Sequence, residues 1–407
     1  MHIGLCSPHW PPSGAANGIV SYVAAVRNHF IASGHDASVI ADGKLFLSDG
    51  RAVPLSDANG GGGGLFAKLG RMAIHKIDSL NDGAMPEVGR IIARQINAAR
   101  AIAPIDIVEM EESFGWSDTV RKRTAVPIVT RLHGPHFLKP PRPRTPDEQR
   151  ADRQRMGAEG RAVRGARTLT APTRAVMDAT CKQYDRATSA ASSVIPNPIA
   201  LAPPAIRWRA DGCEPEHILA VGRFDYWKGA DTMLRAFDTL LRTRPNARLT
   251  LVGPDMGLEV AAGKLVNYNE FVAEHLSPEG RARTRYLGKQ TPDEITALRH
   301  TAQVTVCASR WENFPYALLE GFAAGCPMIC TDWPGGQEII VDGESGLLTP
   351  VGDADALAAR LDMLLGNPAL MAKIAEGGFI RCRDHFSVEA VGAQLLDCYG
   401  AALEGTS

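Results

Sequence analysis

Short apolar segments alternate with longer amphipathic ones along the first half of this 407-residue chain. The apolar segments predict buried strands at residues 2–6, 37–41, 105–109, 127–132, 168–171 and 193–196. Between them, residues 19–33 and 87–103 have helical periodicity. Apolar strands that alternate with helices are typical of a parallel sheet covered on both faces. The five glycines at residues 60–64 predict a loop, because no packed element tolerates such a run.

The same alternation restarts after a proline-rich segment at residues 196–204, which predicts a linker between two domains. Further strands are predicted at residues 217–221, 248–252, 285–287, 304–307, 328–331 and 346–348. Helices are predicted at residues 230–241, 292–300, 316–324 and 354–365. Two rounds of strand and helix predict two doubly wound α/β domains, each lined with loops at the carboxyl ends of its strands.

The composition is that of a soluble globular protein, with 45% hydrophobic and 22% charged residues. No run of 18 apolar residues occurs, and the first residues lack the basic-then-apolar pattern of a secretory signal. We therefore expect neither a transmembrane helix nor a signal peptide. The eight cysteines are scattered without a C-x-x-C pair, which favours reduced thiols in a cytoplasmic protein over disulfides or a zinc site.

The net charge of −1 hides an asymmetry between the halves, because residues 1–200 carry a net +7 and residues 201–407 a net −8. Residues 139–167 contribute nine basic and four acidic side chains to this excess. Such a segment suits an anionic membrane surface or an anionic acceptor. The interleaved acids equally fit a solvated helix face with ion pairs. Aromatic side chains are not interleaved with the basic ones, which argues against nucleic acid as a partner.

The most informative segment is residues 309–320, Ser-Arg-Trp-Glu-Asn-Phe-Pro-Tyr-Ala-Leu-Leu-Glu. Pro315 suits the first position of a helix, so Glu312 is expected just before that helix and Glu320 within it. The free N–H groups at a helix start favour phosphate or sugar oxygens. Two carboxylates beside them could accept hydrogen bonds from hydroxyl groups. A ligand in which a polyol is joined to a diphosphate would offer hydroxyl groups to the carboxylates and phosphate oxygens to the helix start.

This segment resembles the E-x7-E motif of GT4-type retaining glycosyltransferases. Residues 222–229, Gly-Arg-Phe-Asp-Tyr-Trp-Lys-Gly, resemble the phosphate clamp of that family, and residues 334–348 resemble its later glycine-rich turns. The resemblance implies the GT-B fold, an α/β architecture of two facing Rossmann-like domains with parallel sheets and a cleft between them. It implies an acceptor-binding domain at residues 1–200, completed by a C-terminal helix at 388–407, and a nucleotide-sugar domain at 201–387.

The resemblance also implies roles for four residues of the second domain. Arg223 and Lys228 would neutralise the charge that develops on a diphosphate leaving group, which two fixed cations can do without a metal. Glu320 would accept hydrogen bonds from the ribose hydroxyls. Glu312 would contact the transferred sugar or the departing phosphate. No cluster of His, Asp or Glu has the spacing of metal ligands, so no metal or cofactor is expected.

Other positions follow from the same resemblance. His133 comes directly after a predicted strand and would contact a sugar hydroxyl; His136 is an alternative for this role. The backbone at Asn313, Phe314 and Tyr316 would line the nucleotide-sugar site, where Asn313 replaces a glycine common in the family. The remaining nucleotide-sugar contacts are assigned to Gly18, near the diphosphate, and to Gly288 and Lys289, near the base.

These features predict a metal-independent retaining glycosyltransferase that acts in the cytoplasm or at the inner membrane face, with a role in polysaccharide biosynthesis. Its donor would be a UDP-, GDP- or ADP-sugar, and its acceptor a glycan, a lipid-linked precursor or a small molecule. Two alternatives are open at this point. One is an epimerase or hydrolase of nucleotide sugars with a similar fold, and the other is a nucleotide-sugar binding protein without catalytic activity.

Overall fold

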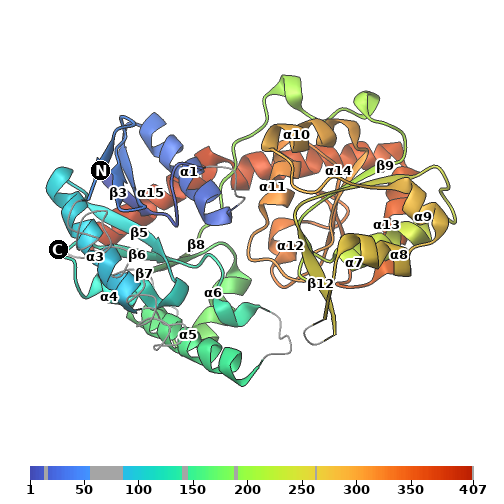
Figure 1. The fold of residues 1–407 in the computed structure, drawn as a ribbon. Helices are drawn as coiled ribbons and strands as arrows, with labels where there is room; N and C mark the ends of the chain where they lie inside the picture. The colour runs from blue at the N-terminus through green and yellow to red at the C-terminus, as the bar shows by residue number, and fades with distance from the viewer. Residues whose placement is uncertain (13–16, 56–85, 140–144, 188–190, 262–263, 406–407) are drawn as a thin grey trace. The chain divides into compact units, whose positions relative to one another are not determined.

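The computed structural model of the chain consists of two compact units (Figure 1). Met1–Pro198 together with Val388–Ser407 form the first unit, and Ile199–Ser387 form the second. The structure describes residues 1–12, 17–55, 86–139, 145–187, 191–261 and 264–405. The predicted glycine loop at residues 60–64 lies outside the described residues. The binding roles predicted for the two domains remain predictions.

The first unit is built on an eight-stranded sheet. The strands follow the spatial order β4 (Ala52–Pro54), β3 (Lys44–Phe46), β2 (Asp36–Ala41), β1 (His2–Cys6), β5 (Ile107–Glu111), β6 (Ile128–Arg131), β7 (Thr168–Ala171) and β8 (Ser192–Val194). The strands from β2 to β8 are parallel, and β3 and β4 add an antiparallel edge. The chain runs outward from β1 on one side and returns to β5 on the other, so the order reverses between β1 and β5.

Helices cover this sheet, and the last helix of the chain is one of them. They are α1 (Gly18–Ala32), α3 (Pro86–Ile102), α4 (Trp116–Arg121), α5 (Pro146–Gly165), α6 (Arg174–Gln183) and α15 (Val388–Glu404). α15 lies beside α1, as the red and blue helices of Figure 1 show. Tyr399 of α15 is fully buried, contacts the Phe30 ring edge to face, and donates a 2.8 Å hydrogen bond to Glu109. This burial explains why the C-terminal helix belongs to the first unit.

The second unit contains a fully parallel six-stranded sheet. Its spatial order is β14 (Thr284–Tyr286), β11 (Arg248–Val252), β9 (His217–Val221), β15 (Val304–Cys307), β16 (Met328–Thr331) and β17 (Leu347–Thr349). The chain starts at β9, moves outward through β11 to β14, and returns to β15. The strand order therefore reverses between β9 and β15, and in such sheets ligands bind beyond the carboxyl ends of the two strands at this point.

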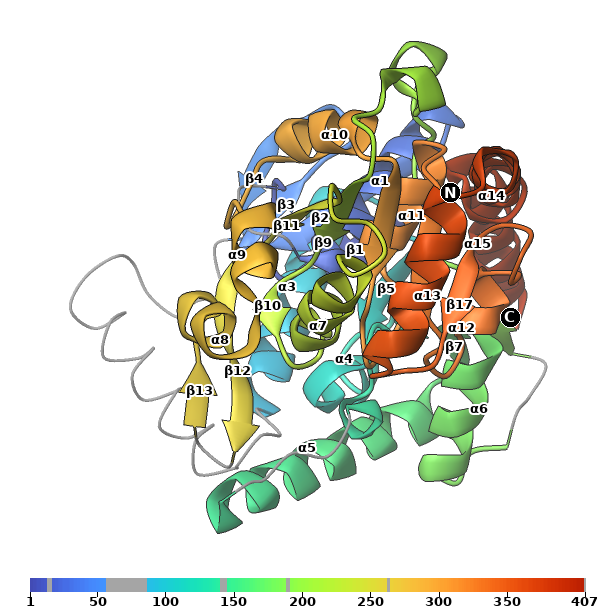
Figure 2. The ribbon, with the colours of Figure 1, turned by 90° about the vertical axis from the view of Figure 1, so that its right-hand side faces the viewer.

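Helices cover both faces of this sheet. They are α7 (Ala230–Leu240), α8 (Tyr268–His275), α9 (Pro278–Arg283), α10 (Pro292–Thr301), α11 (Tyr316–Ala323), α12 (Gly336–Ile339), α13 (Ala354–Leu365) and α14 (Pro368–Arg381). α7 and α13 lie side by side over one face (Figure 2), where their apolar residues share one core with β9 and β11. Phe322 of α11 and Met328 of β16 belong to a second core, which also includes Cys382 directly after α14.

A three-stranded sheet missed by the sequence analysis adjoins the carboxyl end of β9. It consists of β10 (Phe224–Asp225), β12 (Asp255–Ala261) and β13 (Lys264–Val266). β12 pairs in parallel with β10 and antiparallel with β13. Leu258 and Val266 are buried on the unit, so the small sheet is fixed to the main core. Because β10 lies between Arg223 and Lys228, this pairing holds the segment that carries both predicted phosphate-binding residues.

The edge strand β17 ends the main sheet of the second unit. The backbone N–H of Leu348 donates a 2.8 Å hydrogen bond to Oδ1 of Asp342 rather than to a further strand. Nη2 of Arg360 donates a 3.2 Å hydrogen bond to Oδ2 of Asp342. A cavity of about 750 Å³ lies beside this strand and includes Asp332 and Asp342 in its lining, but it contains none of the predicted site residues.

Candidate active site

Asp225 organises the segment that carries the two predicted phosphate-binding cations. This segment follows β9 at the point where the strand order reverses. The Nε of Arg223 donates to Oδ2 of Asp225 at 2.6 Å, and the backbone N–H of Lys228 donates to Oδ1 at 2.7 Å. One carboxylate thus sets both the loop conformation and the direction of the Arg223 side chain. Asp225 lies within the predicted phosphate clamp, but no role was predicted for it from the sequence.

Gly229 brings this segment against the loop that follows β15. Its φ of +65° lies in the left-handed region, and a Cβ at this position would lie 1.9 Å from the carbonyl oxygen of Ala308. Arg310 secures the same approach, because its backbone N–H donates to Trp227 at 2.8 Å and its guanidinium binds Asp231 through two 2.7 Å contacts. The two loops at the reversal point therefore form one rigid junction.

Lys228 and Glu312 form an ion pair within this junction. Nζ of Lys228 lies 2.5 Å from Oε1 of Glu312, and the Ser309 hydroxyl donates to the same oxygen at 2.7 Å. Burial alone would lower the pKa of Lys228, but the adjacent Glu312 carboxylate outweighs it and raises the pKa above its usual value. Lys228 is thus held protonated. The structure brings together two of the predicted residues that are 84 positions apart.

Glu320 lies on α11, which begins at Tyr316 as predicted. Pro315 is the N-cap of this helix, so its assignment to the first helical position was wrong by one residue. The Glu320 side chain is 42% exposed and accepts a 2.6 Å ion pair from Nη2 of Arg299, which is itself buried. Arg299 comes from α10 and was not identified from the sequence.

The other predicted contacts in the second unit lie around these loops. The Phe314 side chain packs edge to face on Phe386 in the core, which leaves only its backbone for a ligand. Asn313 and Tyr316 are half-buried on either side of it. Gly288 has a φ of +63°, and its carbonyl oxygen accepts a 2.8 Å hydrogen bond from the backbone of the loop after β11. Lys289, next to it, is exposed.

In the first unit, His133 follows β6 and is held in the neutral form. Burial, and then the nearby positive charge of Arg131, hold the pKa of His133 well below its usual value. The ring contacts Tyr22 edge to face, with centroids 4.9 Å apart. A neutral imidazole can donate or accept a hydrogen bond with a sugar hydroxyl, but it adds no positive charge to the site.

Glu112 fixes the backbone on which His133 lies. Its side chain is fully buried, and its two oxygens accept hydrogen bonds from the N–H groups of His133 at 2.8 Å and Gly134 at 3.0 Å. Burial, reinforced by the negative charge of Glu159, raises the pKa of Glu112 to about 8. Nothing in the sequence pattern marked this glutamate, because its partners are backbone groups of the loop that follows β6.

The raised pKa of Glu112 predicts that stability falls as pH rises. The folded protein holds this proton more tightly than the unfolded chain, so the stabilisation is fully present below the ordinary glutamate pKa and is lost as pH rises through about 8. One proton changes the free energy of unfolding by about 1.4 kcal/mol per pH unit. Denaturant unfolding between pH 5 and 8.5 should show a shallower pH dependence for Glu112→Gln. An unchanged slope would contradict this assignment.

His136 and Gly18 have structural roles of their own. Nε2 of His136 lies 2.6 Å from the Asp152 carboxylate, and its backbone N–H donates to Glu159 at 2.9 Å, so both groups attach the residue to α5. Gly18 is the first residue of α1, next to the N-cap Asn17, whose side chain accepts a 2.9 Å hydrogen bond from the backbone. Within the described residues, no three His, Cys, Asp or Glu side chains gather closely enough to bind a metal ion.

Two family models match the chain. Glycosyltransferase Family 4 matches residues 16–202, and Glycosyl transferases group 1 matches residues 211–380. The two segments follow one another and together cover most of the chain. The chain belongs to the GT4 glycosyltransferases.

This glycosyltransferase is 28% identical over 205 residues to a glycogen synthase of Mycobacterium tuberculosis, with 49% of its chain and 47% of the relative covered. It thus spans about half the length of that relative. A D-inositol 3-phosphate glycosyltransferase of Nocardioides sp. is 25% identical over 410 residues, with 96% and 87% covered.

Two solved structures have a similar fold. Sucrose-phosphate synthase from Thermosynechococcus elongatus has a TM-score of 0.72 at 19% identity, with 100% of this chain and 99% of that chain covered. Anabaena HepE in complex with UDP-glucose has a TM-score of 0.63 at 16% identity, with 98% and 100% covered. The predicted GT-B class, with two Rossmann-like domains that each contain a parallel sheet, is confirmed.

Proposed function

We propose that this glycosyltransferase moves a sugar from a nucleoside-diphosphate sugar to an acceptor hydroxyl, with retention of configuration and without a metal ion. The observation that carries the proposal is the junction of Lys228 and Glu312 at the carboxyl ends of β9 and β15. A protonated amine fixed there suits a diphosphate, and the adjacent carboxylate suits a sugar hydroxyl. The HepE complex with UDP-glucose makes that sugar nucleotide the first donor to test.

In the proposed reaction, the bond between the anomeric carbon and the diphosphate oxygen breaks, and the electron pair leaves with the diphosphate. Lys228 and Arg223 stabilise this growing negative charge. The acceptor oxygen forms its bond on the same face of the sugar, and its proton moves to the departing phosphate oxygen. Glu320 accepts hydrogen bonds from the ribose, and neutral His133 contacts a sugar hydroxyl.

The test is incubation with UDP-, GDP- and ADP-sugars, with and without candidate acceptors, in the presence of a chelator. We expect release of one nucleoside diphosphate and an anomeric configuration in the product that matches the donor by NMR. Inversion, or strict dependence on a divalent metal, would refute the proposed mechanism. An epimerised sugar would identify an epimerase, and binding without turnover a non-catalytic protein.

His133 and His136 are expected to differ. His133→Ala should lower turnover about tenfold, because the loss of one hydrogen bond costs about 1.4 kcal/mol. The affinity for the nucleoside diphosphate should change little. His136→Ala should leave turnover close to wild type, because its ring is engaged by Asp152. Steady-state kinetics and calorimetric titration measure the two quantities. The reverse ranking would move the assignment to His136.

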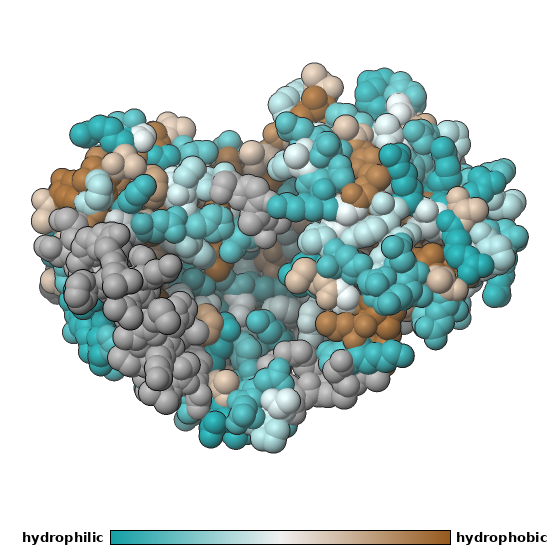
Figure 3. Space-filling model, in the orientation of Figure 1, coloured by the Kyte–Doolittle hydropathy of each residue, from teal (hydrophilic) through white to brown (hydrophobic). Residues whose placement is uncertain are grey.

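The basic segment at residues 139–167 predicts binding to anionic membranes. No helix among the described residues is long and apolar enough to span a bilayer. Arg150 and Arg153 on α5 are exposed, although Arg150 also contacts Asp147 at 3.2 Å. Hydrophilic residues dominate the visible surface at this end of α5 (Figure 3).

Vesicles with anionic lipid should bind at low salt, and the binding should weaken as the Debye length falls from about 10 Å at 0.1 M toward 3 Å at 1 M. Replacement of Arg150 and Arg153, together with Arg142 and Arg144 outside the described residues, should cost about 1 kcal/mol per residue in contact with lipid. If the wild-type protein does not bind anionic vesicles at low salt, residues 139–167 form a solvent-exposed helix face that does not contact lipid.

A further inference from the structure

We propose that Arg299 is a positioning residue for the nucleotide: it holds the Glu320 carboxylate in the orientation that accepts hydrogen bonds from the ribose hydroxyls. This inference rests on the proposed function, in which Glu320 binds ribose. It adds a residue from a different helix, 21 positions away in the sequence, to the recognition of the nucleotide.

The contacts of Arg299 are directed at one face of α11. Its Nη2 donates to Oε2 of Glu320 at 2.6 Å and to the carbonyl oxygen of Ala317 at 3.4 Å. These two acceptors are three residues apart, so they lie on the same side of the helix. The Arg299 side chain is 5% exposed, whereas that of Glu320 is 42% exposed. The buried cation therefore anchors a carboxylate that is open to solvent and to ligands.

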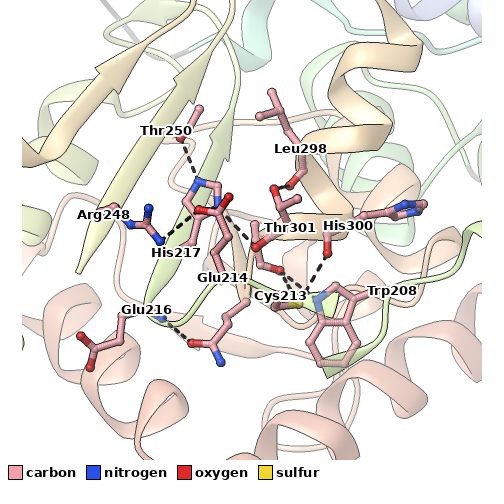
Figure 4. A network of polar contacts seen from close by, with 12 residues as sticks. Trp208, Cys213, Glu214, Glu216, His217, Arg248, Thr250, Leu298, His300 and Thr301 are labelled. Atoms are coloured by element: carbon pink, nitrogen blue, oxygen red, sulfur yellow. Dashed lines mark hydrogen bonds and ion pairs between the residues drawn. The ribbon is translucent and has the colours of Figure 1, made fainter. Parts of the chain in front are cut away.

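The helix that carries Arg299 is itself fixed at its end. Figure 4 shows the polar contacts around the last turn of α10, seen from close by. Nε1 of Trp208 donates to the Ala302 carbonyl at 2.9 Å, and the Cys213 thiol donates to the same oxygen at 3.3 Å. The Thr301 carbonyl accepts a 2.9 Å hydrogen bond from the backbone N–H of Glu214 and a 3.3 Å one from Nδ1 of His217.

This anchoring matters because a mobile glutamate must lose side-chain freedom when a ligand binds. Ordering a free glutamate opposes binding, and a carboxylate already held by an ion pair avoids most of that loss. Oε2 is occupied by Arg299, which leaves the lone pairs of Oε1 for hydroxyl donors. The arrangement therefore favours ligands that present hydroxyl groups at this point, as a ribose does and a deoxyribose does less well.

A purely structural ion pair would behave differently. Loss of its arginine would lower stability but would change the affinities for ribonucleotides and deoxyribonucleotides by the same factor. The preference for ribose over deoxyribose is therefore the measurement that separates positioning from stability. Arg244 offers a matched control, because it pairs with Asp362 at 2.6 Å and Glu216 at 2.9 Å in the same unit, with a 21% exposed side chain.

The experiment uses the full chain and calorimetric titration with UDP, GDP and ADP and the 2′-deoxy and 3′-deoxy form of each. In Arg299→Met we expect the affinity for the best ribonucleotide to fall about tenfold, the loss of roughly one hydrogen bond, while the deoxy forms change little. Arg299→Lys should restore part of the preference. Arg244→Met should lower the unfolding temperature and keep the preference intact.

Glu320→Gln makes the outcomes distinguishable. If Glu320→Gln loses the ribose preference but Arg299→Met and Arg299→Lys both keep it, the inference is wrong and the proposed role of Glu320 survives. If Glu320→Gln itself keeps the preference, the ribose role in the proposed function is wrong. The double variant should match Glu320→Gln alone, because both changes remove the same interaction. Should Arg299→Met fail to fold, Arg299→Lys decides: a preference equal to wild type overturns the inference.

Discussion

Replacement of Lys228 by methionine is expected to lower turnover by roughly 30- to 1,000-fold, equivalent to about 2 to 4 kcal/mol of transition-state stabilisation. The reason is the position of its amine, which is held protonated at the reversal point of the sheet, where a diphosphate would leave. The loss should appear in both kcat and kcat/KM, measured with whichever of the UDP-, GDP- and ADP-sugars proves to be the donor. Arg223→Ala should act in the same direction and less strongly, since its side chain is 47% exposed.

The Lys228 variant needs a control for folding. Without Lys228, Glu312 is left buried next to Ser309 without a counter-charge, which destabilises a protein by itself. The unfolding temperature and circular dichroism of the variant should therefore be compared with those of Arg244→Met, which loses ion pairs outside the candidate site. Near-normal rates in folded Lys228→Met would show that the phosphate role is wrong.

Glu312→Gln is expected to lower turnover roughly thirtyfold, which corresponds to a loss of about 2 kcal/mol of transition-state stabilisation. The affinity for the nucleoside diphosphate should stay nearly unchanged. Oε1 of Glu312 accepts from both Lys228 and Ser309, and a neutral amide cannot balance the lysine charge. The change therefore acts on the reacting sugar and phosphate rather than on the ribose. Turnover measured with the identified donor and calorimetry with UDP separate the two effects.

Glu320→Gln should give the opposite pattern, with weaker nucleotide binding and a smaller effect on turnover at saturating donor. Gln is preferred over Ala for both positions, because its amide keeps an oxygen that can accept from Lys228 or Arg299, whereas truncation would remove that acceptor as well as the charge. An equal loss of nucleotide affinity in both variants would contradict the division of roles. Ser309→Ala removes one hydrogen bond to Glu312 without a charge and should lower turnover only slightly.

The main sheets could be predicted from the sequence because their strands are short apolar runs between turn residues. The prediction for residues 304–307 matches β15 residue for residue. The strand predicted at 105–109 is displaced by two residues from β5, Ile107–Glu111. Its last residues include Glu109 and Glu111, and charged residues are not expected in a central strand. Glu109 is tolerated there because Tyr399 from the far end of the chain donates to it.

The edge hairpin β3–β4 and the strands β10 and β13 could not be predicted, because two or three residues are too few to show alternation. The seven-residue strand β12 does alternate, with Met256, Leu258 and Val260 at every second position, and this signal was missed. The site was predictable only as far as its residues form contiguous motifs. Positions such as Arg223 and Glu320 are visible in such motifs. Their partners are not: Arg299 looks like an ordinary helix residue, and Glu112 binds the backbone of the loop after β6.

Asp342 has a consequence for how copies of this chain meet. An edge strand with free N–H groups is a template on which a strand of another molecule can pair. On β17 the outward N–H of Leu348 is already bonded to the Asp342 side chain, which is itself paired with Arg360. The carboxylate thus takes the position of a neighbouring strand at this N–H, and the β17 edge offers one donor fewer to a strand of another molecule.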